Sequence, residues 1–395
     1  MITLKKRFSD ITNFVFKKKV IVRADLNLPF YEEKVSDYTR LEKIVPTINF
    51  LLKNNSKIIL ISHFGRPDGE KNKELSLQLI KDEIEKLFKK QVHFCADNLK
   101  TIKREKINKI FEKDDILLLE NIRFYPEEEL NDDVFAKKIA SLGDIYINEC
   151  FSVSHREHAS IVGIPKYLPS FPGILLENEI SNLKNLITIN NNSTIAVFGG
   201  AKISTKLEII EFYLKKFEKI IVGGAMANTF LKAQGLEIGN SLYEKNMLKT
   251  AGSFIENYTD KILLPEDVIV LAKNKKNAEA KPTGVIDKND KIFDIGPKTR
   301  LKFFNHIINS EKLLWNGPLG FFEEKPFDEG TNFVVKAVKN NKNKNFFSVA
   351  GGGDTISVLK QLNAFHYFSF ISTGGGAFLE FIRGQGLPGL DSLNE

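Results

Sequence analysis

Four apolar runs in the second half of the sequence end in glycine clusters, at "VFGGAK", "IVGGAM", "FSVAGGGDT" and "FISTGGGAF". Glycine allows backbone amides to approach a phosphate closely, and a helix that starts there adds the partial positive charge of its N-terminus. We expect such helices to begin near Asp354 and near Ala377. One cluster alone fits tight strand-to-helix packing equally well, but four of them favour a phosphate-binding edge.

Arginine is rare in this chain, whose positive charge comes mostly from lysine. Five arginines in the first part of the sequence stand beside the ends of apolar runs or in turn-rich loops: Arg23, Arg40, Arg66, Arg123 and Arg156. A guanidinium group binds phosphate and carboxylate groups through paired hydrogen bonds. Together with His63 in "SHFGRP", these arginines predict a site for a small anion that carries both groups.

The glycine clusters are accompanied by Lys202, Lys206 and Asp354, which suit a nucleoside triphosphate with magnesium. The sequence contains no GxxxxGK[ST] motif, so a Walker-type nucleotide site is excluded. An anionic acceptor on one domain and a nucleotide on the other imply phosphoryl transfer.

Short β-rich runs that alternate with helical patterns must position these residues. The runs in the first part are "KVIVRAD", "KIILIS", "VHFCAD", "ILLLEN" and "DIYINE", and the residues spaced for one helix face are Leu77, Ile80, Ile84 and Leu87. The alternation starts afresh at "TIAVFGG", after three prolines, a helical stretch and an asparagine-rich turn. We therefore predict two doubly wound, Rossmann-like α/β domains with parallel sheets, joined by a hinge helix near residues 173–190. Ligands bind such sheets at the carboxyl ends of the strands.

The composition sets wider bounds on the function. The chain has 395 residues, 42% of them hydrophobic, which is enough for two domain cores. No apolar run has the length of a membrane span and "MITLKKRFSD" lacks the apolar centre of a signal peptide, so a soluble, cytoplasmic protein is expected. Cys95 and Cys150 have no CxxC spacing, which indicates small buried residues rather than a disulfide or a zinc site.

Two further motif matches are not expected to bind a ligand. "GQGLPG" at residues 384–389 fits the GxGxxG pattern, but no helix is expected after Pro388, so a dinucleotide site is not predicted there. "HREH" places His155 and His158 three residues apart without a further Cys or His cluster to complete a zinc site.

Ten segments, spread over nearly the whole chain, resemble those of phosphoglycerate kinases in their residues and in their order. They are "RADLNLP", "SHFGRP", "LLLENIRFYPEEE", "SHREHAS", "FPGILLENE", "FGGAKIST", "GGAMANTFLKA", "WNGPLGFFE", "AGGGDT" and "STGGGAFLE". The resemblance implies the reversible, Mg²⁺-dependent transfer of the acyl phosphate of 1,3-bisphosphoglycerate to ADP, giving 3-phosphoglycerate and ATP in glycolysis. It implies small-molecule substrates, no nucleic acid or membrane partner, and a monomer.

The same resemblance assigns regions of the chain. Residues 1–172 would bind 3-phosphoglycerate, 173–190 would form the hinge helix for domain closure, 191–375 would bind the nucleotide, and 376–395 would return to the first domain. In the acceptor site, Asp25 and Asn27 would bind the hydroxyl and carboxylate end of the glycerate, and Arg40 would lie near the transferring group. The basic patch around the acceptor would be completed by His63, Arg66, Arg123 and Arg156.

In the implied nucleotide site, Lys202 and Lys206 would contact phosphates and Asp354 would bind magnesium. The remaining implied nucleotide-binding residues are Gly200, Ala201, Gly223, Gly224, Phe293, Asn316, Pro318, Glu323, Gly352, Gly353 and Thr355. The implied catalytic residues are Arg40, Lys202, Lys206, Gly352 and Gly375. The acceptor carboxylate has an ordinary pKa near ~4, so it is ionised at neutral pH and no general base is expected.

Several positions depart from the pattern that is usual in the family. Glu149 and Cys150 stand where Asp-Ala is common, and Ser152-Val153 where Gly-Thr is usual. Asn178 and the pair Arg383 and Gln385 are further departures. None removes a charged catalytic group, so they affect expectations about hinge motion and rates rather than the reaction.

The net charge of +7 leaves alternatives open. A nucleic-acid-binding or anion-scavenging protein would bind its partner less tightly as salt rises, and this binding would survive loss of Asp354. Another small-acid kinase would accept acetate, carbamate or aspartate. The phosphoglycerate kinase interpretation instead predicts magnesium-dependent turnover that Arg40→Ala or Asp354→Ala abolishes.

Overall fold

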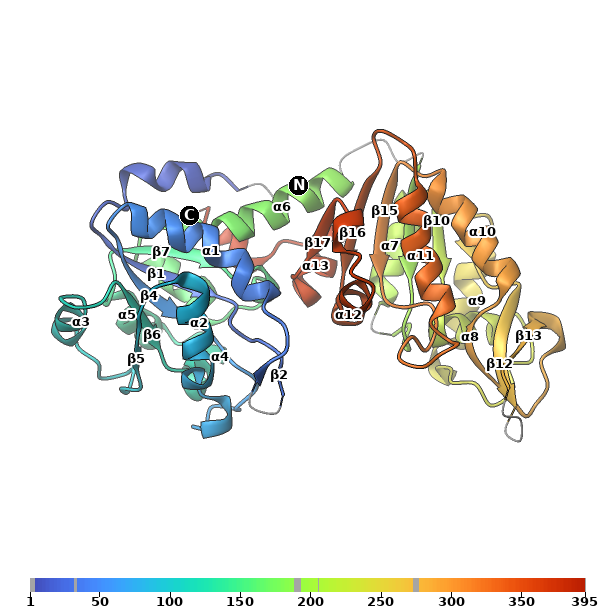
Figure 1. Cartoon of the computed structure of the whole chain (residues 1–395), viewed down its shortest axis with the longest axis horizontal. Coiled ribbons are helices and arrows are strands. Elements are labelled where there is room, and N and C mark those ends of the chain that lie inside the picture. The colour runs from blue at the N-terminus through green and yellow to red at the C-terminus, as the bar shows by residue number, and fades with distance from the viewer. Residues whose placement is uncertain (1–3, 32–33, 188–192, 205, 273–276, 395) are drawn as a thin grey trace. The chain divides into compact units, whose positions relative to one another are not determined.

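The structure, a computed structural model, describes residues 4–31, 34–187, 193–204, 206–272 and 277–394 and divides into two compact units (Figure 1). Unit 1 comprises Met1–Ser181 and Gly376–Glu395, and unit 2 comprises Asn182–Gly375. Helix α6 (Ile174–Ile187) covers most of the predicted hinge segment, whose residues 188–190 lie outside the described residues. The domain boundaries proposed from the sequence stay predictions.

Unit 1 is built on a parallel sheet, and the five runs that the sequence pattern marked as strands form all of its described strands except β8. Within the described residues it has six strands in the order β5-β6-β4-β1-β7-β8. Their bounds are β1 (Lys19–Ala24), β4 (Lys57–Ile61), β5 (Val92–Cys95), β6 (Ile116–Leu119), β7 (Ile145–Glu149) and β8 (Ser170–Pro172). A small antiparallel pair is formed by β2 (Phe30–Tyr31) and β3 (Lys34–Val35).

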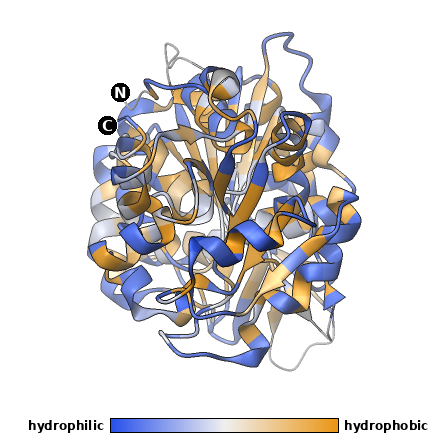
Figure 2. Cartoon of the chain, turned by 90° about the vertical axis from the view of Figure 1, so that its left-hand side faces the viewer, coloured by the Kyte–Doolittle hydropathy of each residue, from blue (hydrophilic) through white to orange (hydrophobic). Residues whose placement is uncertain are grey.

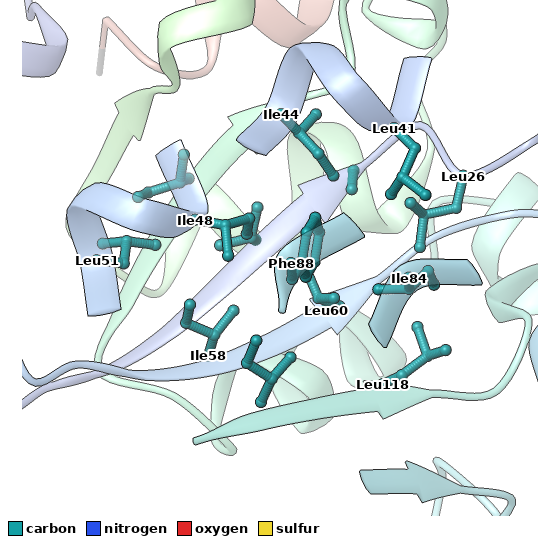
Figure 3. Close-up of a cluster of buried hydrophobic side chains, with 14 of the residues drawn as sticks. Leu26, Leu41, Ile44, Ile48, Leu51, Ile58, Leu60, Ile84, Phe88 and Leu118 are labelled. Atoms are coloured by element: carbon teal, nitrogen blue, oxygen red, sulfur yellow. The ribbon is translucent and has the colours of Figure 1, made fainter. Parts of the chain in front are cut away.

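Both faces of this sheet are buried, which explains why its strands are mostly apolar and do not alternate between apolar and polar residues. Val20 and Val22 of β1 belong to a core cluster with side chains of α1 (Thr39–Lys53) and α2 (Lys81–Phe88), drawn in Figure 3. Ile21, between them, points to the opposite face and is also buried. The remaining helices of unit 1 are α3 (Arg104–Ile110), α4 (Pro126–Glu129), α5 (Asp133–Ala140), α13 (Gly375–Ile382, all but its first residue) and α14 (Pro388–Asp391).

Unit 2 contains a second parallel sheet, with the order β11-β10-β9-β15-β16-β17 in the part of the chain that is described. Its strands are β9 (Thr194–Phe198), β10 (Lys219–Val222), β11 (Ile262–Leu263), β15 (Lys312–Asn316), β16 (Phe347–Gly351) and β17 (Phe370–Ser372). A separate antiparallel sheet consists of β12 (Asp267–Ala272), β13 (Glu279–Pro282) and β14 (Asp290–Ile295).

Helices cover both faces of the larger sheet in unit 2. Trp315 of β15 lies in a core cluster with Phe303 of α10 and Val334 of α11, whereas Phe198 of β9 packs against Tyr213 of α7 with ring centroids 5.6 Å apart. The helices are α7 (Leu207–Lys216), α8 (Gly224–Ala233), α9 (Leu248–Asn257), α10 (Pro297–Ile308), α11 (Glu329–Asn340) and α12 (Gly353–Gln361). In Figure 2 the strands are mostly orange, whereas the helices also carry blue, hydrophilic residues.

The predicted fold class, α/β with two parallel sheets, is confirmed, and α12 and α13 begin close to the expected positions. The expectation that no helix follows Pro388 is wrong. Helix α14 begins at Pro388 itself, because proline tolerates the first helical position, where its missing N–H group has no partner to lose. Among the described residues, no helix has both the length and the apolar character needed to cross a membrane.

Candidate active site

At the carboxyl edge of the unit 1 sheet, the structure brings Asp25, Asn27 and Arg40 together. Asp25 directly follows β1, and its Oδ1 accepts a hydrogen bond from the backbone N–H of Asn27 (3.1 Å). Arg40, in the first turn of α1, donates from Nη1 to the same Oδ1 (3.3 Å) and to the carbonyl of Asn27 (2.8 Å). The Asp25 carboxylate and the Arg40 guanidinium are therefore held in a fixed mutual orientation.

His63, which follows β4, is buried beside these residues. Burial, and after it the positive charges of Arg23 and Arg123, lower the pKa of His63 well below its ordinary value. The ring is therefore neutral at physiological pH. Its Nδ1 faces Nη2 of Arg23 at 3.3 Å, and since a guanidinium can only donate, Nδ1 is the accepting nitrogen.

The other predicted basic residues stand on the loops that follow the neighbouring strands. Arg123, after β6, donates from Nη1 to the carbonyl of Gly65 (3.1 Å), next to Arg66. Arg66 and Arg156 are exposed. Because parallel strands end at one edge, this part of unit 1 concentrates guanidinium groups around Asp25, an arrangement suited to a small anion.

Arg23 is one of the five arginines that the sequence pattern marked, but it was given no individual role; in the structure it contacts His63 and Cys150 at the site. Its side chain is fully buried and donates to Ser160 Oγ (2.7 Å) and to the carbonyl of Ala24 (2.6 Å). Its position on an apolar strand resembles that of a core residue, so the sequence pattern alone did not reveal this role.

Asp25, His63 and Cys150 offer ligand-type atoms within 4.8 Å of one another, a spacing that would allow a metal ion. The guanidinium of Arg23 nevertheless lies against His63 and donates to Cys150 Sγ (3.6 Å). A fixed positive charge in contact with two of the three ligands disfavours a cation, so this cluster fits the anion site rather than a metal site.

Unit 2 contains a cavity of about 420 Å³ at the carboxyl edge of its sheet. Small-molecule sites commonly have volumes of this order. The predicted nucleotide-binding residues that line it are Gly200, Ala201, Gly224, Phe293, Pro318, Glu323 and Asp354. The ring of Phe293 stacks on Phe327 with centroids 4.6 Å apart, which gives one wall a flat aromatic surface.

The glycines around this cavity fall into two groups. Gly199, Gly224 and Gly317 serve close packing between loops: a Cβ on Gly199 would lie 1.8 Å from the carbonyl oxygen of Pro318, and one on Gly224 would lie 2.8 Å from the amide of Gly200. At Gly353 and Gly375 a Cβ would meet no described atom within 4 Å. At Gly353 a ligand, and not the protein, would therefore require the missing side chain, whereas the positive φ of 53° at Gly375 already favours glycine in the protein itself.

Three predicted residues lie beneath the loops and outside the cavity lining. Lys206 donates from Nζ to the carbonyls of Gly199 (2.8 Å) and Asn316 (3.1 Å). Asn316 Nδ2 donates to Gly351 O (2.8 Å), and Thr355 Oγ1 accepts from the amide of Gly317 (2.8 Å). In the geometry seen here, these side chains tie neighbouring glycine loops to one another.

Burial lowers the pKa of Lys206 to about 8, an effect that the charge of Asp354 opposes. Helix α7 begins after Lys206, so Lys202 and Lys206 do not share one helix face; Lys202 is exposed. Gly223 packs on Leu319, and Gly352 has a positive φ of 100° next to Asn316.

Asp354 is exposed in the first turn of α12 and lines the cavity directly after the unobstructed Gly353. Carboxylate oxygens are the ligands that magnesium prefers, usually together with phosphate oxygens and water. The donor chemistry and position of Asp354 therefore fit a magnesium ion carried by a nucleotide.

The sequence prediction missed the part of the cavity formed by the antiparallel sheet and α8. The missed lining residues include Asn228, Leu242, Val268, Ile292, Asp294 and Phe321. The β-branched and aromatic residues of "DVIVLA" and "KIFDIG" were the available signal for these strands. Asp294 accepts hydrogen bonds from the amides of Gly330 (2.7 Å) and Ile295 (2.8 Å), and burial raises its pKa to about 7.

Comparison with known proteins gives concordant results. The family model described as phosphoglycerate kinase matches residues 10–385. The chain is 42% identical to the phosphoglycerate kinase of Orientia tsutsugamushi (strain Ikeda), over 98% of this chain and 97% of that protein. It is 40% identical to that of Sinorhizobium fredii, over 99% of both. Among solved structures, phosphoglycerate kinase from Coxiella burnetii matches 98% of both chains with a TM-score of 0.85 and 34% identity.

Proposed function

The chain belongs to the phosphoglycerate kinase family and is a phosphotransferase, and on this premise we propose the detailed reaction and its residues. The reaction is the reversible transfer of the acyl phosphate of 1,3-bisphosphoglycerate to Mg-ADP, which gives 3-phosphoglycerate and ATP. One observation carries the proposal: unit 1 has a guanidinium-rich edge around Asp25, and unit 2 has an apolar cavity that leads to Gly353 and Asp354. The expected form is a cytoplasmic monomer, which size-exclusion chromatography checks for the oligomeric state.

On the acceptor side, the chain binds and orients 3-phosphoglycerate and removes no proton from it. The acceptor carboxylate is already ionised, and His63 is held neutral, so neither group needs to act as a base. Asp25 and Asn27 bind the hydroxyl and carboxylate end, and the exposed Arg66 and Arg156 bind the acceptor's own phosphate. Arg40 stabilises negative charge near the transferring group.

On the nucleotide side, the cavity takes the base between small and aromatic side chains, with Glu323 toward the ribose. The amides that follow Gly352 and Gly374 face the phosphates, since Gly353 and Gly375 leave that space open. Magnesium held by Asp354 would neutralise phosphate charge and orient the transferring group. Lys202 and Lys206 add positive charge, and Lys206 must exchange a backbone carbonyl for a phosphate oxygen to do so.

Closure by hinge bending about α6 belongs to the same proposal. This helix runs from unit 1 into unit 2, and its two ends are anchored separately: Leu176 donates its amide to Glu149 in unit 1, and Asn185 accepts a hydrogen bond from Lys312 in unit 2. Closure would exclude water from the transferring group.

The deciding experiment measures ADP formation from ATP and 3-phosphoglycerate in a coupled dehydrogenase assay, with and without magnesium. Turnover that requires both the glycerate and magnesium supports the proposal. A folded protein that turns over acetate, carbamate or aspartate instead, or nothing at all, would refute it. Arg40→Ala should abolish turnover, with Arg104→Ala as the matched control, because Arg104 pairs with Asp144 away from Asp25.

A further inference from the structure

A hydrogen-bond chain leads from the buried Arg23 to the Asp25 carboxylate through two side chains that no step of the proposed reaction uses. Arg23 Nη1 donates to Cys150 Sγ (3.6 Å), and Cys150 Sγ lies 3.5 Å from Ser152 Oγ. Ser152 Oγ in turn donates to Asp25 Oδ2 (2.5 Å). Cys150 directly follows β7, and Ser152 lies in the short 3₁₀ helix Phe151–Val153 that comes next.

Elementary chemistry fixes the direction of this chain. An ionised carboxylate only accepts, so the Ser152 hydroxyl proton points to Asp25, and the Ser152 oxygen is left to accept from the Cys150 S–H group. The sulfur lone pairs then face the Arg23 guanidinium, which only donates. Arg23 therefore donates to Cys150, Cys150 donates to Ser152, and Ser152 donates to Asp25.

The two oxygens of Asp25 are held from different directions. Oδ1 accepts from the Asn27 amide and from Arg40, and Oδ2 accepts from Ser152. Without Ser152, Oδ2 would lose its described hydrogen-bond donor, and only the two bonds to Oδ1 would restrain rotation of the carboxylate. A serine side chain is needed here, since glycine offers no hydroxyl.

We propose that Ser152, supported by Cys150, is a positioning residue that fixes Asp25 for binding the hydroxyl group of the acceptor. This inference rests on the proposed function, because it assigns Asp25 to the glycerate. It concerns binding and not the transferring phosphate, so it affects the ground state and the transition state alike. Burial raises the pKa of the Cys150 thiol to about 11, which agrees with a neutral hydrogen-bonding thiol rather than a reactive one.

The test compares Ser152→Ala and Ser152→Thr, and Cys150→Ala and Cys150→Ser, in the full chain. Ser152→Ala should raise KM for 3-phosphoglycerate on the order of tenfold while kcat and KM for ATP stay within about twofold. Ser152→Thr and Cys150→Ser keep a hydroxyl donor and should restore most of the affinity. Cys95→Ala is the matched control, since Cys95 is the other buried cysteine of unit 1 and ends β5, not β7.

A second substrate separates positioning from a general structural role. 3-Phosphooxypropanoate lacks the hydroxyl group that Asp25 would bind. With this acceptor, Ser152→Ala and the unmodified chain should therefore have the same KM. An equal loss with both acceptors, or no loss with either, overturns the inference. Titration calorimetry with 3-phosphoglycerate reports binding independently of turnover. If the unmodified chain neither binds nor converts 3-phosphoglycerate, the proposed function itself fails and the inference falls with it.

Discussion

Replacing Glu149 by glutamine is expected to change how the stability of unit 1 depends on pH. Glu149 ends β7 and is fully buried, and its carboxyl accepts hydrogen bonds from the Thr47 hydroxyl and from the amide of Leu176 (3.1 Å) in the first turn of α6. Burial raises its pKa from 4.5 to about 7, an effect that the hydrogen bond from Thr47 opposes. Glutamine has the same shape and no proton to lose.

The magnitude follows from this shift. Between pH 4.5 and about 7 the folded protein keeps a proton that the unfolded chain has released, so the free energy of unfolding falls as pH rises through this window and stays level above it. At about 1.4 kcal/mol per pH unit, the full loss is roughly 3 kcal/mol. Glu149→Gln removes this pH dependence, so the stability of the variant relative to the parent chain should increase from pH 5 to pH 8.

The measurement is a urea titration at pH 5, 6, 7 and 8, followed by far-ultraviolet circular dichroism. Trp315 lies buried in unit 2, so its fluorescence transition serves as an internal control that the substitution should leave in place. Parallel pH profiles for the variant and the parent chain would refute the reasoning, because they would mean that Glu149 ionises in the folded state as easily as in water.

Three other predictions, which use four substitutions, test the nucleotide side. Lys206→Met should lower turnover by roughly a hundredfold yet raise the urea midpoint of unit 2 at pH 7, because burial disfavours the charged lysine. In the parent chain, the free energy of unfolding should rise from pH 8 to 10.5, because only the unfolded chain keeps Lys206 protonated in this window. A free energy of unfolding that does not change over this pH range would contradict the prediction. Gly353→Ala should raise KM for ATP at least about tenfold and leave the thermal midpoint unchanged. Gly199→Ala should instead lower the thermal midpoint, because its Cβ would overlap Pro318. If the two variants changed KM and the thermal midpoint to the same extent, this distinction between the two glycines would be refuted. Asp354→Asn should reduce turnover by roughly a hundredfold at 1 mM magnesium (about the ordinary assay level), with part of the loss regained as magnesium is raised; a loss that magnesium titration does not relieve would speak against a metal ligand.

The sequence pattern was sufficient to predict the parallel sheets and which loops share an edge. Strands such as Lys19–Ala24 and Thr194–Phe198 are mostly apolar because both faces are covered, and the residues that end such strands must converge. Asp25, His63 and Arg123 were therefore expected together before any coordinates, and the structure places them together.

What could not be predicted depends on contacts between distant parts of the chain. Whether Gly199 serves the fold or a ligand is decided by the carbonyl of Pro318, more than a hundred residues away, and nothing local in "VFGGAK" carries that information. The burial of Lys206 against Asn316 has the same origin. The strands of the antiparallel sheet are partly exposed and lack a clear alternation of polar and apolar residues, so the parallel pattern around them was the stronger signal.

The division of the chain into units also bears on the order in which it acquires its structure on the ribosome. Residues Gly376–Glu395 belong to unit 1, where the amide of Gly389 donates to Ser154 and Phe381 packs against Phe151 with ring centroids 6.0 Å apart. Unit 2 is contiguous in sequence and can fold once it has left the ribosome. Unit 1 is synthesised first, but it can be completed only when residues Gly376–Glu395, which follow unit 2, have been synthesised. Until then the surface around Phe151 stays open to chaperones, and nascent-chain proteolysis would detect this interval.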